Sequence, residues 1–301
     1  MSENNAPTIS VITVSVNCSP LIIECLRALN NQQGDFNAEI IVVSCCDNET
    51  AELIRKNFPN VMLLQFSERL AIPQLRAIGM SHATANIVAV TEDCCIPQED
   101  WVCEIIKAHE SGYQAVGGVV EKTNCAGIID CACYLCEYSH AMLPIPYGEV
   151  NGIPGNNASY KREILDKVDK SIKRNYWEFF LHEEMRKLGV KFLSVPTIVV
   201  SKRKEFGFLY FLTQRFHYSR SFAGMRRTKI PVPKLLLHAL FSPLLPFLMI
   251  QRIAKQVVQK KRYRKEFLLS LPVMAVLSVG HALGEFAGYL FGPGNSLNKV
   301  E

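Results

Sequence analysis

The stretch Asn86-Ile-Val-Ala-Val-Thr-Glu-Asp-Cys-Cys-Ile-Pro97 joins an apolar run to two adjacent carboxylates and a proline. Its Ile and Val residues predict a central parallel strand ending at Glu92 and Asp93, and open α/β sheets bind ligands at the carboxyl ends of such strands. Carboxylate oxygens there suit Mg²⁺ or Mn²⁺, whose remaining ligands are usually waters and substrate phosphates. The alternative is that both acids merely favour the helix predicted after Pro97.

Strand and helix patterns alternate along the first 200 residues. The predicted strands cover residues 9–17, 39–44, 61–66 and 86–92, and helices at 20–29, 49–57 and 74–84 separate them. Strands joined by helices of this length predict right-handed βαβ units. The expected fold class is therefore α/β, with a mostly parallel, Rossmann-like sheet.

Four segments, in this order, resemble the family 2 glycosyltransferases with the A-type nucleotide-sugar fold, over roughly residues 8–200. They are Ile9-Ser-Val-Ile-Thr-Val-Ser-Val-Asn17, Pro73-Gln-Leu-Arg-Ala-Ile-Gly79, Thr91-Glu-Asp93 and Gly155-Asn-Asn-Ala-Ser-Tyr-Lys-Arg162. Thr91-Glu-Asp93 stands where the family carries its Asp-x-Asp metal motif. The resemblance implies inverting sugar transfer from a nucleotide-sugar donor to an acceptor hydroxyl, with Asp93 on the metal ion and Glu92 assisting it.

The resemblance also implies donor contacts. Ser15 keeps the polar character of the family's Pro-Thr-Tyr-Asn segment after the first strand. Ser44 replaces the aspartate that usually ends the second strand, so Asp47 is the candidate for contacting the base, or else a helix cap. Arg76 matches the arginine of the family's Ala-Arg-Asn-x-Gly segment, and would orient the carboxylates or bind the diphosphate bidentately, unless it is an ordinary helix-surface arginine.

On the acceptor side, the attacking hydroxyl must lose its proton to a base, and a carboxylate within hydrogen-bond reach is the usual solution. Glu178 is the candidate, because its surroundings resemble the family's Glu-Asp or Trp-Glu segment. Its neighbour Trp177 is placed beside the acceptor and starts an apolar helical stripe. Asn156 and Asn157 lie in the loop that closes the acceptor side in the family. Structural alternatives are an acid favoured by the helix dipole and a Gly-Asn turn.

All 11 cysteines fall between Cys18 and Cys136. An odd number scattered through apolar segments predicts no disulfide framework and a reducing, cytosolic setting. Cys131, Cys133 and Cys136, with His140, offer a zinc site as an alternative to buried small side chains. The polar N-terminal segment, residues 1–6, has no basic flank and apolar core of the kind that export sequences carry.

The charge is distributed unevenly along the chain. Residues 1–200 contain 16 basic and 24 acidic residues, a net charge of −8, whereas residues 201–301 contain 17 and 4, a net charge of +13. The predicted domains are thus a nucleotide-sugar-binding domain over 1–200 and a basic, apolar helical region over 201–301. Apolar runs at 235–250 and 267–291 beside this charge favour an anionic membrane over nucleic acid.

The expected location is the cytosolic face of a membrane, the cell membrane being the simplest case. Pro243 and Pro246 break the first apolar run, which predicts an interfacial or re-entrant helix, and the second run is expected to be shallow or a single crossing. The linker Gln251 to Lys265 carries seven basic residues and no acid. Such linkers stay in the cytosol. A core hairpin packed without lipid is the alternative.

Two other functions are compatible with the same pattern. A nucleotidyltransferase would also use a metal and carboxylates, but it normally has a Gly-rich phosphate loop, and residues 14–20 contain no glycine. A catalytically inactive scaffold would explain why Thr91 and Ser44 replace acids. The acceptor of the expected transferase is a sugar, a lipid-linked group or another hydroxyl compound.

Overall fold

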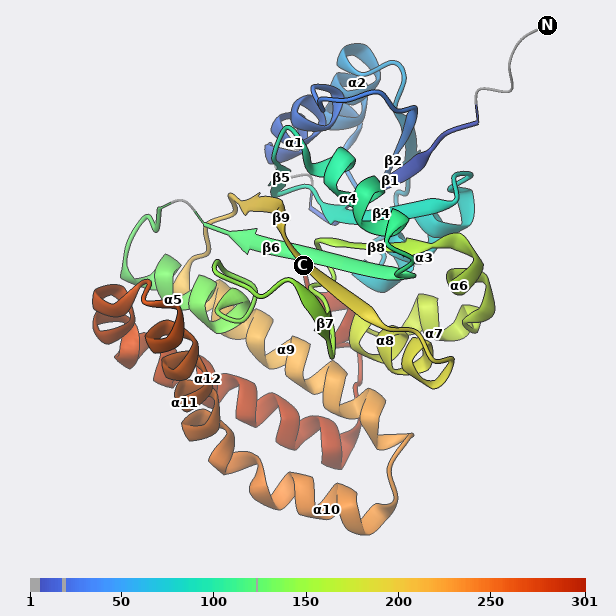
Figure 1. The fold of residues 1–301 in the computed structure, drawn as a ribbon. Coiled ribbons are helices and arrows are strands. Elements are labelled where there is room, and N and C mark those ends of the chain that lie inside the picture. The colour runs from blue at the N-terminus through green and yellow to red at the C-terminus, as the bar shows by residue number, and fades with distance from the viewer. Residues whose placement is uncertain (1–5, 18–19, 123) are drawn as a thin grey trace, which may run out of the picture. The chain divides into compact units, whose positions relative to one another are not determined.

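The computed structural model describes residues 6–17, 20–122 and 124–301 (Figure 1). Unit 1 consists of the described residues up to Glu121 together with Leu143–Lys204, and unit 2 of those in Lys122–Met142 and Glu205–Glu301. The domain boundary at residue 200 stays a prediction, but the segment from Lys122 to Met142 belongs with the C-terminal helices. Residues 1–5, on which the expectation about export rests, lie outside the described part.

Unit 1 is a mixed, mostly parallel α/β sheet with the strand order β3-β2-β1-β4-β8-β6-β9-β5, and β7 pairs with β9. The strands in the described residues are β1 (Ile9–Ser15), β2 (Ala38–Ser44), β3 (Met62–Gln65), β4 (Ile87–Glu92), β5 (Cys95–Pro97), β6 (Ala115–Glu121), β7 (Gly148–Val150), β8 (Ala158–Lys161) and β9 (Phe192–Lys202). Strands β1 to β4 are parallel, as predicted, whereas β8 is antiparallel to both of its neighbours.

The helices of unit 1 lie in the connections between these strands. They are α1 (Leu21–Asn30), α2 (Asn48–Asn57), α3 (Ile72–His82), α4 (Trp101–Glu110), α6 (Arg162–Lys167), α7 (Lys170–Asn175) and α8 (Glu178–Lys187). Right-handed crossovers place α1 and α2 on one face of the sheet and α3 on the other, where it packs on β1, β2 and α7. Helix α3 begins two residues before the predicted start, since Pro73 fits its first turn.

The parallel register brings the ends of β1 and β4 together. Val14 lies opposite Glu92, and the backbone N–H of Asp93 donates to the Val14 carbonyl at 3.1 Å. Every residue of β1 is buried, as expected for a central strand covered on both faces. The backbone hydrogen bonds of these strands therefore bring Ser15, Glu92 and Asp93 together at the carboxyl ends of β1 and β4.

Asn157, predicted on the acceptor side, forms side-chain hydrogen bonds with residues of β6, β9 and α4. Its Nδ2 donates to the carbonyls of Val119 at 2.8 Å and Ile198 at 3.0 Å, and its Oδ1 accepts from the Trp101 indole at 2.8 Å. The pairing of β6 with β9 is irregular between Gly117 and Val119, so the amide completes hydrogen bonds that the ladder leaves open there. These contacts use both N–H groups of the Asn157 amide, and its contact with the acceptor stays a prediction.

Unit 2 is helical. Its helices are α5 (Ile128–Tyr138), α9 (Phe208–Arg227), α10 (Val232–Phe241), α11 (Leu245–Lys260) and α12 (Arg264–Phe291), with 3₁₀ turns η1 (Ser242–Leu244) and η2 (Leu297–Lys299). The main core forms where α5, α9, α11 and α12 meet, around Leu135, Phe211, Ile253 and Met274. Helix α12 runs along α9 over much of its length (Figure 1).

Three glycines set how closely α12 approaches α9. A Cβ on Gly280 would lie 2.5 Å from a methyl carbon of Leu212, one on Gly284 would lie 2.3 Å from the Phe216 carbonyl oxygen, and one on Gly288 would lie 2.5 Å from the Arg220 carbonyl oxygen. Their spacing of four residues puts all three on one helix face, the small-residue pattern that lets helix backbones pack in direct contact.

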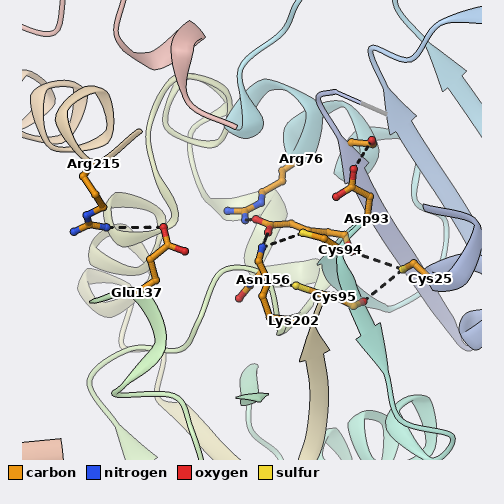
Figure 2. A network of polar contacts seen from close by, with 11 residues as sticks. Cys25, Arg76, Asp93, Cys94, Cys95, Glu137, Asn156, Lys202 and Arg215 are labelled. Atoms are coloured by element: carbon orange, nitrogen blue, oxygen red, sulfur yellow. Dashed lines mark hydrogen bonds and ion pairs between the residues drawn. The ribbon is translucent and has the colours of Figure 1, made fainter. Parts of the chain in front are cut away.

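Polar side chains are paired inside this helical unit. Arg215 of α9 donates from Nη2 to Nδ1 of His281 at 2.8 Å, and its Nη1 lies 3.9 Å from Glu137 of α5, the contact drawn in Figure 2. Nε2 of His281 lies 3.6 Å from Glu285. The acid and the imidazole within the second apolar run therefore have partners, which removes much of the cost of their burial.

Two helical segments are long and apolar enough to cross a membrane, judged by length and composition. They are Val232–Lys260 and Arg264–Phe291, and 22% and 44% of their most apolar stretches are buried. The first is interrupted at η1, where Pro243 lies, which agrees with the predicted break. The prediction that residues 251–265 form a linker is wrong, because most of them are helical. Helix α11 extends to Lys260, and only a short turn separates it from α12.

The sequence predicted no disulfide framework, but the described residues include disulfide-bonded cysteines. Cys125 and Cys131 are bonded, because the loop before α5 folds back onto the first turn of that helix. Cys133 and Cys136 are free and buried. Among the described residues, Cys131, Cys133, Cys136 and His140 do not gather as a set of metal ligands, so the zinc alternative has no support.

Asn157→Ala should destabilise unit 1 by at least about 2 kcal/mol, because the Trp101 indole and two buried carbonyls lose their partner, and each such group costs about 1–3 kcal/mol. Both tryptophans of the chain lie in unit 1, so urea unfolding followed by tryptophan fluorescence reports on that unit. Asn57→Ala, at the exposed end of α2, is the control and should change stability by no more than about 0.5 kcal/mol. Equal effects of the two substitutions would contradict this role.

Candidate active site

Glu92 lies between two basic side chains at the end of β4. Its Oε1 accepts from Nη2 of Arg76 at 3.0 Å, and its Oε2 accepts from Nζ of Lys202 at 3.1 Å (Figure 2). Nη1 of Arg76 donates in turn to Oε2 of Glu178, also at 3.0 Å. Four alternating charges thus connect the end of β9, the end of β4, helix α3 and the start of α8.

The electrostatics of this chain of charges favour its ionised form. Burial opposes the charge of Glu92, but Lys202 and Arg76 outweigh it and lower the pKa of Glu92 to about 2. Burial also opposes the charge of Arg76, and the neighbouring carboxylates of Glu178 and Glu92 raise its pKa nonetheless. Both oxygens of Glu92 are occupied, so its predicted role of assisting a metal ion has no support in these contacts.

Asp93 has a different environment, although it is the next residue. Its Oδ2 accepts from the Ser15 hydroxyl at 2.6 Å, and Figure 2 shows its carboxylate lying apart from the guanidinium of Arg76. Glu92 is the last residue of β4, whereas Asp93 is the first residue of the turn that follows the strand. Burial raises the pKa of Asp93, and the Ser15 hydrogen bond and the Lys202 charge offset this only in part.

The donor set at Asp93 fits a hard divalent cation. No Lys, Arg or His among the described residues forms an ion pair with this carboxylate, unlike Glu92. A partly buried carboxylate that forms no ion pair is stabilised when a cation binds. Mg²⁺ and Mn²⁺ are commonly held by one or two carboxylates, with waters and substrate phosphates as the other ligands. Asp93 alone would supply the protein's carboxylate, because Glu92 is already paired.

Glu178 is the first residue of α8, and Trp177 is the N-cap residue before it. Its carboxylate borders a small pocket lined by Arg76, Gly155, Tyr160 and Tyr176, among others. The side chain keeps 26% of its surface exposed, against 10% for Arg76. The acid predicted as the base is thus both fixed by an ion pair and accessible to a second substrate.

Lys202 was missed by the analysis of the sequence. Its Nζ contacts Sγ of Cys94 at 3.0 Å in addition to Glu92, and the side chain is buried. Glu92, Cys94 and Cys95 place their possible ligand atoms within 4.8 Å of one another, but the ammonium of Lys202 already contacts two of the three residues. The only sequence signal for Lys202 was its place in a run of three basic residues at the end of an apolar strand.

Three other predicted residues have structural contacts. Asp47 is exposed and caps α2, accepting from the Thr50 backbone N–H at 2.7 Å, so the capping alternative is present in the structure and a contact to the base stays a prediction. Trp177 is 3% exposed and anchors the start of α8. Asn156 is buried beside the site and donates to Sγ of Cys95 at 3.4 Å (Figure 2).

Comparison with known proteins agrees with this geometry. The profile of the family described as Glycosyl transferase family 2 matches residues 10–169. No curated protein sequence matches the chain.

Solved structures share the fold at low sequence identity. The mannosyltransferase PcManGT from Pyrobaculum calidifontis, in complex with GDP-Man and Mn²⁺, has a TM-score of 0.57 and 16% identity, and the match covers 92% of this chain and 88% of that one. Residues 1–349 of S. aureus TarS have a TM-score of 0.53 and 14% identity, and the match covers 93% of this chain and 90% of that one. The same TarS fragment in complex with UDP-GlcNAc has a TM-score of 0.52 and 15% identity, and the match covers 93% of this chain and 91% of that one.

Glu92 should make the stability of unit 1 depend on acid pH. Its folded pKa of about 2 lies below its ordinary value of 4.5, so its contribution is fully present above about pH 4.5 and is lost as the pH falls towards 2. The shift corresponds to about 3 kcal/mol. Urea unfolding at several pH values should show a shallower decline for Glu92→Gln than for the wild type, and parallel curves would contradict the ion-pair assignment.

Proposed function

The chain belongs to glycosyl transferase family 2, a family of nucleotide-sugar glycosyltransferases, and we propose that it transfers a sugar with inversion from a nucleotide-sugar to an acceptor hydroxyl. The observation that carries this proposal is that two carboxylates of the site, Asp93 and Glu178, have different contacts. Asp93 lies at a strand end and forms no ion pair with any described residue, and Glu178 is fixed beside a pocket. One acid is suited to the donor and the other to the acceptor.

On the donor side, Asp93 would hold the divalent ion, and Ser15 keeps the Asp93 carboxylate oriented through its hydroxyl. The ion, when bound, would offset the negative charge that develops on the leaving diphosphate. Solved structures of similar fold bind GDP-Man with Mn²⁺ in one case and UDP-GlcNAc in another. A nucleoside diphosphate sugar is therefore the class of donor to be tested, with the base and the sugar left open.

On the acceptor side, Glu178 would accept the proton of the attacking hydroxyl. The acceptor oxygen forms a bond to the anomeric carbon of the sugar while the bond from that carbon to the diphosphate oxygen breaks. The electron pair of the broken bond leaves with the diphosphate, and the proton moves to a carboxylate oxygen of Glu178. This single displacement inverts the anomeric centre. Arg76 fixes the position of Glu178 at 3.0 Å and so prepares it for the hydroxyl.

A pair of isosteric substitutions separates the two proposed roles. Asp93→Asn should remove most metal-dependent binding of GDP or UDP in calorimetric titration with Mn²⁺, since a neutral amide is a poor ligand for a hard cation. Glu178→Gln should keep that binding and lose about 10²- to 10⁴-fold in turnover, measured as nucleoside diphosphate release from a panel of nucleotide-sugars.

Each outcome bears on a different part of the proposal. Unchanged metal-dependent affinity in Asp93→Asn would remove Asp93 from the donor site. Turnover of Glu178→Gln at nearly the wild-type rate would place the base elsewhere. Donor binding by the wild-type chain without turnover on any acceptor would favour the inactive scaffold.

We further propose that unit 2 binds an anionic membrane surface at the cytosolic face. Large apolar side chains on α10, η1 and α11 are more than half exposed, among them Leu240, Leu244 and Phe247. Exposed basic side chains lie in α11, in the turn that follows it and at the start of α12, including Lys255, Lys261 and Arg264. This combination is typical of helices that lie in a membrane interface, where apolar burial and attraction to anionic lipid act together.

Replacing exposed leucines should weaken this membrane binding. Burying a leucine contributes about 1.5–3 kcal/mol, so Leu240→Ser/Leu244→Ser should lower affinity for phosphatidylserine-containing vesicles at least about tenfold in a flotation assay. Leu53→Ser, at an exposed leucine of α2 in unit 1, is the control and should have no effect. Undiminished flotation of the double variant would contradict the proposed surface, and equal binding to neutral vesicles would exclude a role for the basic residues.

A further inference from the structure

We propose that Gly155 is a positioning residue for Glu178, because a side chain at this position would push the Glu178 carboxylate away from Arg76. This inference rests on the proposed function, in which Glu178 is the base. Gly155 lies in the loop before β8 and borders the same pocket as both charged residues. From the sequence, its loop was expected either to close the acceptor side, as in the family, or to form a Gly-Asn turn.

The space around Gly155 is filled by the ion pair itself. A Cβ at this position would lie 2.6 Å from both Cγ and Cδ of Glu178, and 2.9 Å from Nη1 of Arg76. Carbon atoms in contact are normally about 3.5–4.0 Å apart, so any side chain here would force one of its neighbours to move. The three atoms nearest to Gly155 therefore belong to the pair that fixes the proposed base.

Of the three groups involved, Glu178 is the one that can give way. The guanidinium of Arg76 is held from its other side by Glu92, and its side chain is only 10% exposed. The loop around Gly155 is held too, because the Asn157 backbone N–H donates to the Pro154 carbonyl and the Asn157 amide is bonded to the sheet. Glu178 is the most exposed of the three, at 26% of its side chain.

The backbone gives no other reason for glycine here. The φ angle of Gly155 lies outside the left-handed region that disfavours side chains, in contrast to Gly148 in the same connection. Alanine is therefore compatible with the backbone, and the obstacle is the volume of its methyl group. Gly152, three residues earlier, also lies outside that region, and a Cβ added there would have no described atom within 4 Å. It provides a matched control for the same substitution in the same loop.

The donor side should not respond to this change. Ser15 ends β1, Asp93 follows the end of β4, and their side chains are hydrogen-bonded to each other. Gly155→Ala should accordingly leave metal-dependent binding of GDP or UDP within about twofold of the wild type. Turnover should fall about 10²-fold, since a displacement of about 1 Å at a catalytic group has costs of that size. Gly152→Ala should leave both quantities unchanged.

A stability cycle tests the contact independently of turnover. Gly155→Ala should destabilise the wild-type protein, and should cost less when Glu178→Ala has already removed the side chain it displaces. Urea unfolding followed by tryptophan fluorescence gives the four values, and residues in contact commonly couple by about threefold to a hundredfold in the unfolding equilibrium constant. If Gly155→Ala does not fold alone, recovery of folding in the double variant measures the same coupling.

The outcomes separate this inference from the proposed function. Equal costs of Gly155→Ala in the two backgrounds, or wild-type turnover in Gly155→Ala, would overturn the positioning role. Coupling in the stability cycle, together with no turnover by the wild-type chain on any donor, would support the contact and overturn only the proposed activity.

Discussion

The partly buried carboxylate of Glu92 is the constraint on which the candidate site depends. Its Oε1 accepts from Arg76 of α3 at 3.0 Å, and its Oε2 accepts from Lys202, the last residue of β9, at 3.1 Å. Removing one member of a buried ion pair leaves an uncompensated charge and typically costs about 3–5 kcal/mol. Arg76, Lys202 and, through Arg76, Glu178 therefore take their positions from a single acid that is itself set by the register of β1 and β4.

Glu92 and Asp93 are adjacent in the sequence but have different environments. Glu92, the last residue of β4, is hydrogen-bonded to basic side chains, whereas Asp93, in the turn that follows, accepts from Ser15. Glu92 is paired with protein cations, whereas Asp93 forms no ion pair with any described residue and is the acid that we propose for the metal ion.

Local patterns in the sequence were sufficient for much of the fold. Alternating apolar runs predicted the four parallel strands and their crossover helices, and the resemblance to a known family placed Arg76 near Glu92. Contacts made by distant residues were out of reach: Lys202 is 110 positions from Glu92, and the antiparallel pairing of β5 with β9 decides where it ends. The role of Asn157 depends on an irregular pairing of β6 with β9 that no local pattern encodes.

The glycine face of α12 bears on how the helical unit behaves in different solvents. Association of helices in water relies largely on expelling water from apolar surfaces, a force that is lost once lipid chains surround them. The contacts of Gly280, Gly284 and Gly288 with α9 are instead direct van der Waals contacts, made mostly with its backbone. Because these contacts do not require water, they would hold α9 and α12 together in lipid as well as in water.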